Sequence, residues 1–489
     1  MTVVSAYAVP HPPLILPEVG KGQEKLIKDT IAAYEEAARH MALMQPETVV
    51  LLSPHATMYA DYFHISPGPG AKGDMKAFGA EGPETKVIYD QEFVSALEVL
   101  ASREGLPAGT LGERERSLDH GSVVPLRFFQ QAYAGFQVVR IGVSGLSAAE
   151  HYRLGQYIAA VAGELNRPAA IIASGDLSHR LKSDGPYGFA PEGAEFDHRL
   201  MTALERADFL ELLRFDPDFC EAAGECGLRS FVIMAGAFDG RQVKARRLSY
   251  EGPFGVGYGL CLFEGDPSDS NPSAASPSAA SPSDPSRLDP SRQFLSIYEE
   301  EEQGALAAIR EQEDVYVRTA RYAIEQYVGQ RKRLRGRGDL PPALAAALTA
   351  EMEGSRAGTF VSLKKNGRLR GCIGTIGPTR PTLLEEILHN AVSACAEDPR
   401  FDPVEEQELS QLVINVDVLG EPEPIETMAQ LDVRRYGVIV SQGLRRGLLL
   451  PDLPGVDTPA RQVEIALQKA GIKEGQPYKM ERFEVIRHK

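Results

Sequence analysis

The chain has 489 residues, of which 43% are hydrophobic and 25% charged, so it exceeds one ordinary core and has the composition of a soluble globular protein. Its net charge of −16 disfavours a general nucleic-acid binder, and no apolar run approaches the ~20 residues of a membrane span. The first residues lack the basic and apolar regions of a secretory signal. Five cysteines without a Cys-x-x-Cys pair argue against a disulfide framework or a structural zinc site. We expect a cytoplasmic protein without a membrane or nucleic-acid partner.

A segment rich in Pro, Ser and Ala divides the chain. Residues 265–293 repeat Pro-Ser-Ala-Ala-Ser and hold almost no apolar side chain to bury, which is typical of a flexible linker. An ordered loop of that length inside one compact domain would be unusual. The sequence therefore predicts two domains, 1–264 and 294–489, that move independently.

The first domain alternates expected strands with expected helices. Short runs rich in Val and Ile predict strands at 3–9, 48–53, 137–143 and 169–174. The apolar spacing predicts helices at 23–43, 148–165, 200–213 and 228–238, before two closing strands at 243–250 and 256–263. This alternation predicts an α/β fold whose mostly parallel central sheet is flanked by helices.

The second domain mixes strands and helices without a regular rhythm. We expect helices at 300–328, 381–393 and 459–470, and strands at 358–363, 413–419, 436–441 and 447–450. Asn366 and Gly367 mark a hairpin turn after the first of these strands. The pattern predicts an α+β domain.

Four of the ten histidines stand in the first domain at strand ends or in tight turns, namely His11, His55, His120 and His179. Strand ends are where α/β folds place ligands and catalytic residues. Imidazole is the commonest metal ligand and transfers protons near neutral pH. A turn or a buried polar contact explains any one of these histidines equally well, but the set of four favours a metal-dependent enzyme domain.

Two imidazoles and one carboxylate hold a first-row metal and leave positions for substrate, an arrangement that with Fe(II) supports oxygen chemistry. His11 and His55 follow successive expected parallel strands, whose ends should be neighbours, and are the candidate imidazole ligands. Glu225, just before an expected helix, is the candidate carboxylate. A carboxylate in that position also suits a helix start, where the helix dipole stabilises it.

His120 and His179 are left for a different role, because five protein ligands would leave little room for substrate. A histidine without the metal can transfer protons when it lies within hydrogen-bond reach of the reacting group. Asp119 and Asp176 lie close to them in sequence, and we expect these carboxylates to orient His120 and His179.

Residues 1–264 resemble the class III extradiol ring-cleavage dioxygenases, the LigB-like superfamily that also contains the Memo proteins. The resemblance rests on Val-Pro-His-Pro-Pro, Ser-Pro-His, Asp-His-Gly-Ser-Val-Val-Pro-Leu and Gly-Asp-Leu-Ser-His, in this order. It implies that His11, His55 and a late glutamate hold Fe(II). It also implies that His179 is the acid–base catalyst and that His120 lines the substrate pocket.

The resemblance leaves the third metal ligand open. Memo-like proteins carry a Cys-Gly pair at this point, which Cys226 and Gly227 match, so that either Glu225 or Cys226 faces the metal. A thiolate would favour a softer or redox-sensitive site over plain oxygenase chemistry. Fe(II) is the expected metal, with Zn²⁺ or copper as alternatives.

The reaction that the resemblance implies is ring cleavage of a catechol-like diol with O₂. The diol would bind Fe(II) through both oxygens, and His179 would take or return the proton as the ring opens. The segment 187–193 is a candidate lid, although loops rich in Gly and Pro usually only connect elements.

Residues 310–489 resemble the AMMECR domain. The matching stretches begin at Leu369 with Leu-Arg-Gly-Cys-Ile-Gly-Thr-Ile-Gly-Pro-Thr-Arg, at Asp398 with Asp-Pro-Arg-Phe, and at Arg445 with Arg-Arg-Gly-Leu-Leu-Leu-Pro. The fusion of this domain to a Memo-like one is similar to the AmmeMemoRadiSam system, whose third member is a radical-SAM protein. The resemblance therefore implies a radical-SAM partner.

Cys372 lies in the most distinctive of these stretches, near Arg368 and Arg370, and nearby cations favour a reactive thiolate. A small buried hydrophobe is the more common role of a free cysteine. The glycines around it would allow a ligand or another strand to approach closely. Four arginines would form either a basic patch for a phosphate or an acidic partner, or ordinary solvated surface. They are Arg370, Arg400, Arg445 and Arg446.

The leading hypothesis is a non-haem iron dioxygenase-like domain joined to an AMMECR domain that recognises a partner or substrate. The alternative is a metal-binding redox or scaffold component of an AmmeMemoRadiSam system that does not cleave rings. A third hypothesis, in which both domains act only in assembly, is disfavoured by the complete set of four histidines.

Overall fold

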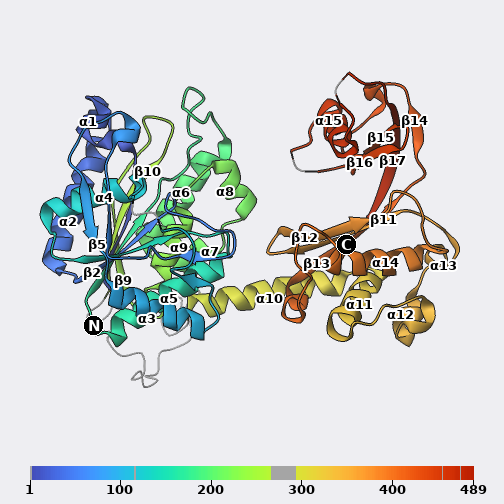
Figure 1. Ribbon diagram of the computed structural model, residues 1–489, viewed down its shortest axis with the longest axis horizontal. Helices are drawn as coiled ribbons and strands as arrows, with labels where there is room; N and C mark the ends of the chain where they lie inside the picture. The colour runs from blue at the N-terminus through green and yellow to red at the C-terminus, as the bar shows by residue number, and fades with distance from the viewer. Residues whose placement is uncertain (1–2, 115–116, 266–292, 454, 474) are drawn as a thin grey trace, which may run out of the picture. The chain divides into compact units, whose positions relative to one another are not determined.

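The computed structural model describes residues 3–114, 117–265, 293–453, 455–473 and 475–489. The chain forms two compact units, residues 1–301 and 302–489. Figure 1 shows the elements of each in chain order. The expected linker at 265–293 lies outside the described residues, apart from its two end positions.

The N-terminal unit is built on a sheet with the strand order β7-β2-β8-β1-β10-β9. The first four of these strands are parallel to one another, whereas β10 pairs in antiparallel fashion with both β1 and β9. The strands are β1 (Val3–Val9), β2 (Thr48–Ser53), β7 (Gln137–Gly142), β8 (Ala169–Ser174), β9 (Val243–Glu251) and β10 (Tyr258–Gly265). The predicted α/β class and mostly parallel sheet are therefore confirmed.

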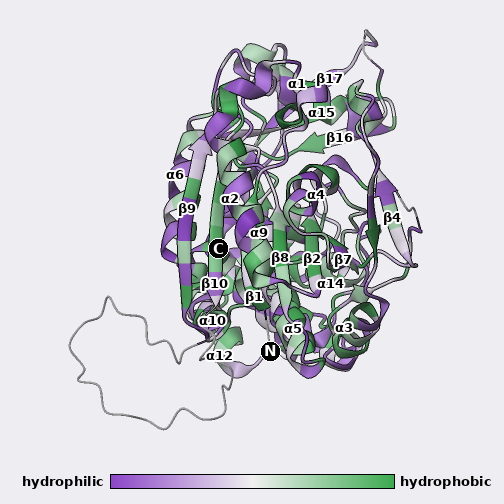
Figure 2. Ribbon diagram, turned by 90° about the vertical axis from the view of Figure 1, so that its left-hand side faces the viewer, coloured by the Kyte–Doolittle hydropathy of each residue, from purple (hydrophilic) through white to green (hydrophobic). Residues whose placement is uncertain are grey.

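Helices cover both faces of this sheet, so β2 and β8 are buried along their whole length. The apolar colouring of these strands in Figure 2 reflects that double burial. One face packs against α2 (Lys28–Met44) and α4 (His120–Ala132). The other face packs against α3 (Gln91–Arg103), α5 (Ala148–Glu164), α6 (Pro191–Arg206), α7 (Phe209–Leu213) and α9 (Leu228–Gly236).

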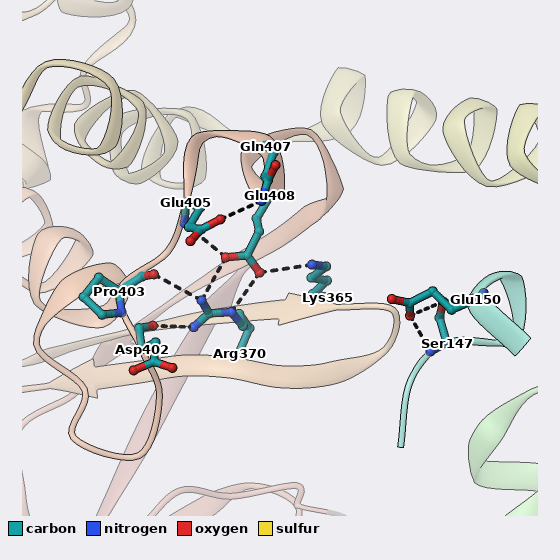
Figure 3. Close-up of polar contacts among 9 residues, drawn as sticks. All are labelled: Ser147, Glu150, Lys365, Arg370, Asp402, Pro403, Glu405, Gln407 and Glu408. Atoms are coloured by element: carbon teal, nitrogen blue, oxygen red, sulfur yellow. Dashed lines mark hydrogen bonds and ion pairs between the residues drawn. The ribbon is translucent and has the colours of Figure 1, made fainter. Parts of the chain in front are cut away.

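Smaller elements complete this unit. They are α1 (Pro17–Gly20), α8 (Pro217–Ala223), β3 (Phe63–His64), β4 (Gly70–Gly73), β5 (Thr85–Ile88) and β6 (Ala108–Gly109). The four small strands and α3 lie in a long excursion of the chain between β2 and α4. Helix α5 begins with a capping box, in which Ser147 and Glu150 exchange side-chain and backbone hydrogen bonds (Figure 3).

Two expectations for this unit were wrong in detail. β1 and β2 are not neighbours, because β8 lies between them and pairs with both. The helix expected at 200–213 is two helices, which part where Ala207 adopts a left-handed conformation and Asp208 caps the next helix.

The single helix expected at 300–328 is also two helices, α10 (Phe294–Gln312) and α11 (Val315–Gln330). The side chain of Asp314 accepts hydrogen bonds from the backbone of Tyr316 and Val317 and thereby begins α11. The first turns of α10 belong to the N-terminal unit, where Leu295 is buried in its core. The division between the units therefore falls inside α10, after residue 301, rather than at 294.

The C-terminal unit contains a sheet with the order β12-β11-β13-β17-β15-β16, and β14 pairs with β17. The pairings between these strands are antiparallel, which confirms the expected α+β architecture. The strands are β11 (Thr359–Lys365), β12 (Arg368–Gly374), β13 (Leu412–Leu419), β14 (Glu423–Ile425), β15 (Tyr436–Gln442), β16 (Arg445–Leu449) and β17 (Lys479–His488). The remaining helices are α12 (Pro342–Ala347), α13 (Ala350–Gly354), α14 (Leu383–Ala396) and α15 (Pro459–Ala470).

The predicted hairpin turn connects β11 to β12. Asn366 and Gly367 both have positive φ angles, 51° and 73°, as a tight hairpin of this kind requires. In the middle of β12, the backbone of Gly371 lies so close to α14 that a Cβ atom would clash with the carbonyl oxygen of Ala394. The close approach predicted for this glycine is thus made by a helix.

Candidate metal centre

The four histidines converge at the carboxyl edge of the parallel strands in the N-terminal unit. His11 follows β1, His55 follows β2 and His179 follows β8, while His120 is the first residue of α4. The rings of His55 and His120 lie 4.1 Å apart, and those of His11 and His55 lie 4.8 Å apart. The sheet thus brings together residues that are far apart in sequence.

Three side chains are arranged as metal ligands. The Nε2 atoms of His11 and His55 lie 3.0 Å apart, and the Sγ atom of Cys226 lies 3.7 Å from Nε2 of His11. Their ligand atoms all fall within 4.8 Å of one another. Bonds of about 2.0–2.3 Å from imidazole nitrogen and thiolate sulfur to one ion would fit such spacing. His11 is buried and Cys226 partly buried, whereas His55 is exposed.

Hydrogen bonds fix the tautomer of His11. The hydroxyl of Ser174 donates to the carbonyl oxygen of Gly121 at 2.6 Å, so its oxygen accepts from Nδ1 of His11 at 2.9 Å. Nδ1 therefore carries the proton, and Nε2 presents its lone pair to His55 and Cys226. Burial is the main cause that lowers the pKa of His11 to about 3, which keeps the ring neutral at neutral pH.

Asp176 connects two of the three residues. Its carboxylate accepts a hydrogen bond from the backbone N–H of His11 at 2.7 Å, and its own N–H donates to Sγ of Cys226 at 3.3 Å. Burial raises the pKa of Asp176 to about 6 and that of Cys226 well above its ordinary value. A cation at this site would thus bind a thiolate only by displacing the thiol proton.

Glu225 does not join this group. Its carboxylate turns to the start of α9, where it accepts a hydrogen bond from the backbone N–H of Leu228 at 2.7 Å. Gly227 is the N-cap residue of α9 and has no side chain to cap the helix, so Glu225 does so instead. The geometry therefore places Cys226 toward the histidines and assigns Glu225 the helix-start role.

Asp119 organises the wall of the site without touching the ring of His120. It caps α4 by accepting from the backbone of Ser122 at 3.0 Å, and it accepts from Ser53 at 2.7 Å. Arg140 pairs with the same carboxylate at 2.7 Å. These partners outweigh burial and hold the pKa of Asp119 below its ordinary value. The result is a hydrogen-bonded ion pair behind the histidines.

His120, at the start of α4, and His179, after β8, lie beside the three candidate ligands. Burial, aided by the neighbouring histidines, lowers the pKa of His120 to about 4, and the ring of Phe78 stands 5.1 Å from it. Nδ1 of His179 donates to the carbonyl oxygen of Gly224, so Nε2 is the ring nitrogen left to interact with a ligand. Tyr187, from the candidate lid segment, contacts His179 edge-on at 5.2 Å between ring centroids.

A cavity of about 390 Å³ is formed by the same loops that carry His11 and His179. Leu14 and Lys182 line it from these two loops, and Tyr258 lines it from β10. The volume falls in the range of sites for small molecules. The N-terminal unit therefore combines a candidate metal group, neutral imidazoles and space for a small ligand.

In the C-terminal unit, the arginines expected to form a basic patch have partners. The guanidinium of Arg370 binds the carboxylate of Glu408 and the carbonyl oxygens of Asp402 and Pro403, as Figure 3 shows. Arg400 pairs with Asp398, Arg446 pairs with Glu481, and Arg445 donates to the carbonyl of Gly471. Arg370 is thus bound to Glu408 rather than directed at the thiol of Cys372.

Comparisons with known proteins agree with the two units. Residues 5–261 match the family model of the catalytic LigB subunit of aromatic ring-opening dioxygenase, and residues 317–488 match the AMMECR1 model. A relative from Clostridium acetobutylicum is 38% identical over 496 residues, which cover 100% of both chains. A protein of Thermotoga maritima is 46% identical over 179 residues, or 36% of this chain and 98% of its own.

Solved structures also match parts of the chain. An uncharacterized protein from Pyrococcus horikoshii covers 36% of this chain and 90% of its own, with 32% identity and a TM-score of 0.32. Across the described residues, no helix combines the length and the apolar character required to cross a membrane. On its matched models and its full-length relative, the chain belongs to the LigB family of aromatic ring-opening dioxygenase subunits and carries an AMMECR1 domain after the LigB domain.

Proposed function

We propose that the N-terminal unit is a metal-dependent oxidoreductase that acts on a small aromatic diol and holds one iron(II) ion through His11, His55 and Cys226. The convergence of these three ligand atoms within 4.8 Å is the observation that carries the proposal. Iron bound there would supply redox chemistry and Lewis acidity toward substrate oxygens. Two imidazoles and a thiolate also suit Zn²⁺ or copper, so the metal has to be determined directly.

The chain's own residues would bind the diol and move its protons. The cavity of about 390 Å³ accommodates a single aromatic ring, and Tyr258 and Leu14 offer it an apolar wall. Nε2 of His179 is free to accept a hydroxyl proton, because Nδ1 is engaged with Gly224. The ring of Phe78 stands 5.1 Å from that of His120 and offers an apolar surface beside it.

The test is metal content and oxygen consumption of anaerobically purified full-length protein. We expect about one iron per chain in the wild type, with loss of iron in His11→Ala and Cys226→Ala. Glu225→Gln is the matched control, since it alters the adjacent residue and should retain iron. Oxygen consumption with catechol-type diols would support ring cleavage. Iron retained in Cys226→Ala but lost in Glu225→Gln would overturn the ligand assignment.

A second function is favoured by one specific observation, the presence of a cysteine in the candidate group. A thiolate ligand makes a site softer and sensitive to oxidation, which suits a redox or scaffold component that does not cleave rings. We propose a radical-SAM protein as the partner in that case, on the strength of the fusion of LigB and AMMECR1 domains in one chain.

One measurement tests the thiolate ligand that both functions use, and oxygen consumption then separates the two functions. Protein loaded with cobalt(II) should show a sulfur-to-metal absorption band that disappears in Cys226→Ser, which tests the thiolate ligand without any assay of activity. Iron-loaded protein that binds diols without consuming oxygen would favour the redox component. Oxygen consumption that depends on a diol and ceases in His179→Gln would favour the dioxygenase.

A further inference from the structure

A buried tyrosine lines the cavity of the N-terminal unit. Tyr258 is 3% exposed and is one of the residues around the space of about 390 Å³. In the antiparallel pairing of β10 with β1, Ala8 stands opposite Cys261. Tyr258 precedes Cys261 by three residues and His11 follows Ala8 by three, so both come from the same end of the strand pair. The tyrosine therefore lies at the edge of the sheet where the candidate metal ligands gather.

The hydroxyl of Tyr258 has no hydrogen-bond partner among the residues that the structure describes. Tyrosine hydroxyls that are removed from solvent usually find one. That of Tyr34 donates to the carbonyl oxygen of Pro10, and that of Tyr250 donates to Asp197 at 2.7 Å. In the described part of the chain, the fully enclosed side-chain atoms without a partner do not include the oxygen of Tyr258. Its small accessible surface therefore includes the hydroxyl, which the fold leaves open toward the cavity.

The other polar side chains of the cavity lie on its solvent side. Among the described residues that line it, Lys182, Asp184 and Tyr258 have polar side chains, and the first two are exposed. The ammonium of Lys182 already donates to the carbonyl oxygen of Pro253 at 2.8 Å. The remaining lining side chains, such as that of Val256, are apolar. A molecule in the cavity would thus meet the hydroxyl of Tyr258 in apolar surroundings, where a hydrogen bond is strong.

We propose that Tyr258 determines specificity at the metal site by donating a hydrogen bond to an acceptor on a substituent of the aromatic ring. The inference rests on the proposed function, because it requires a diol that reaches both the metal group and this cavity. It narrows the substrate to aromatic diols that carry a carbonyl or a similar acceptor. An analogue without the acceptor would cover the hydroxyl and leave it unpaired, which disfavours binding.

The probes are 3,4-dihydroxyacetophenone and 4-ethylcatechol, which share the diol and differ in one carbonyl group. Anaerobic titration calorimetry of full-length protein, purified with its metal, measures the dissociation constant of each. The two diols differ in acidity, but that difference is the same for every variant and cancels when variants are compared.

We expect Tyr258→Phe to weaken binding of 3,4-dihydroxyacetophenone by about threefold to tenfold, the range for one neutral hydrogen bond. Binding of 4-ethylcatechol should stay equal or become tighter, because phenylalanine leaves no unpaired hydroxyl against the ethyl group. The preference of the site for the carbonyl probe should therefore fall by at least about threefold.

Two other tyrosines provide matched controls. The hydroxyl of Tyr133 donates to the carbonyl oxygen of Gly135 at 3.1 Å, before β7 and thus at the opposite end of the strands, so Tyr133→Phe should leave both constants unchanged. In denaturant without ligand, Tyr258→Phe should not lower the unfolding midpoint, because the lost hydroxyl has no partner. Tyr250→Phe removes the hydrogen bond to Asp197 and should lower it.

The outcomes separate this inference from the proposed function. Two probes that bind the wild type and Tyr258→Phe with the same ratio of constants would overturn the inference alone. Equal weakening of both probes would also overturn it, because the hydroxyl would then act on the shared diol. A midpoint lowered in Tyr258→Phe as far as in Tyr250→Phe would show that the hydroxyl serves stability. Failure of both probes to bind the wild type would remove the proposed function together with the inference.

Discussion

The carboxyl edge of the N-terminal sheet and the β11–β12 hairpin of the C-terminal sheet both present a cysteine among charged or titratable groups, yet they are assembled differently. At the edge, each side chain comes from a different segment of the chain, and Cys226 meets His11 only because β1, β8 and α9 are packed together. In the hairpin, the register of two strands alone sets Cys372 opposite Ser362. A site made of loops depends on every strand beneath it, whereas a pair of residues on a sheet depends on the turn and the register of two strands, here with one register shift between the turn and the pair.

The largest expected effect tests how closely β12 packs against α14 in the C-terminal sheet. In Gly371→Ala the new methyl group would meet the backbone of α14, so we expect a loss of about 1–3 kcal/mol in the stability of the C-terminal unit. Hydrogen exchange of peptides from β12 and α14 in rising denaturant measures it. Gly377→Ala, where no atom lies within 4 Å of the added Cβ, is the control. Equal stability of the two variants would contradict the close packing of β12 on α14.

The next effect concerns the loop-built edge. Ser174→Ala removes the acceptor that keeps the proton on Nδ1 of His11, so metal affinity should fall by about tenfold to a hundredfold. A competition titration against a chelator of known affinity measures the fall. Ser144→Ala, at a buried serine after another strand of the same sheet, should bind metal as the wild type does. Unchanged metal affinity in Ser174→Ala would show that this hydrogen bond does not set the tautomer of His11 for metal binding.

A third prediction compares two carboxylates that each accept a hydrogen bond from a backbone N–H. Asp398 has a cation beside it, so Arg400 keeps its pKa well below the ordinary range. Asp197 accepts from the backbone of Ser178 without such a cation, and burial raises its pKa from 3.8 to about 7. Between these two pH values the folded state binds more protons than the unfolded state, so this group's contribution to stability falls as the pH rises.

Asp197→Asn cannot ionise and should remove this dependence. We expect stability of the N-terminal unit in the wild type to decline from about pH 4 to about pH 7, by at most about 1.4 kcal/mol per pH unit from this residue. The variant should show a flatter profile in denaturant midpoints measured across that range. Parallel profiles for the two proteins would mean that Asp197 is ionised throughout, and the contrast with Asp398 would disappear.

The smallest effect tests the turn that sets the register. Gly367 has a φ of 73° and no atom within 4 Å of an added Cβ, so Gly367→Ala meets backbone strain without a steric clash. We expect a cost of about 1 kcal/mol, from the left-handed backbone alone. Thermal unfolding measures this loss of stability, and the Gly371→Ala protein, unfolded under the same conditions, provides the comparison. A cost equal to that of Gly371→Ala would show that the turn is as constrained as the packed strand.

Much of this arrangement follows from sequence because it depends on local pattern. The strands at 3–9, 48–53 and 169–174 are observed with the same bounds that their apolar runs predict. The hairpin at Asn366 likewise follows from its turn residues. The break before α11 was missed, although Asp314 followed by an apolar residue is a recognisable helix start.

The rest depends on tertiary contacts that the sequence does not display. Whether Glu225 or Cys226 faces the histidines is decided by Gly227, since a helix start without a capping side chain draws in the nearest carboxylate. Arg370, which the sequence places near Cys372, binds Glu408 instead, whereas Arg400 donates to the carbonyl oxygen of Cys372. Spacing alone gives no indication of such partners.

The excursion between β2 and α4 has an evolutionary consequence. Residues 54–119 leave the sheet after one strand end and return at the start of α4, and the segment brings Phe78 to the ring of His120. Of the three candidate ligands, only His55 lies in this segment, at its start, so insertions or substitutions beyond His55 can alter the surface beside His120 without replacing a ligand. Relatives that diverge mainly in this segment should therefore share a metal and differ in the molecules they accept, which makes the excursion a natural place for new specificities to arise.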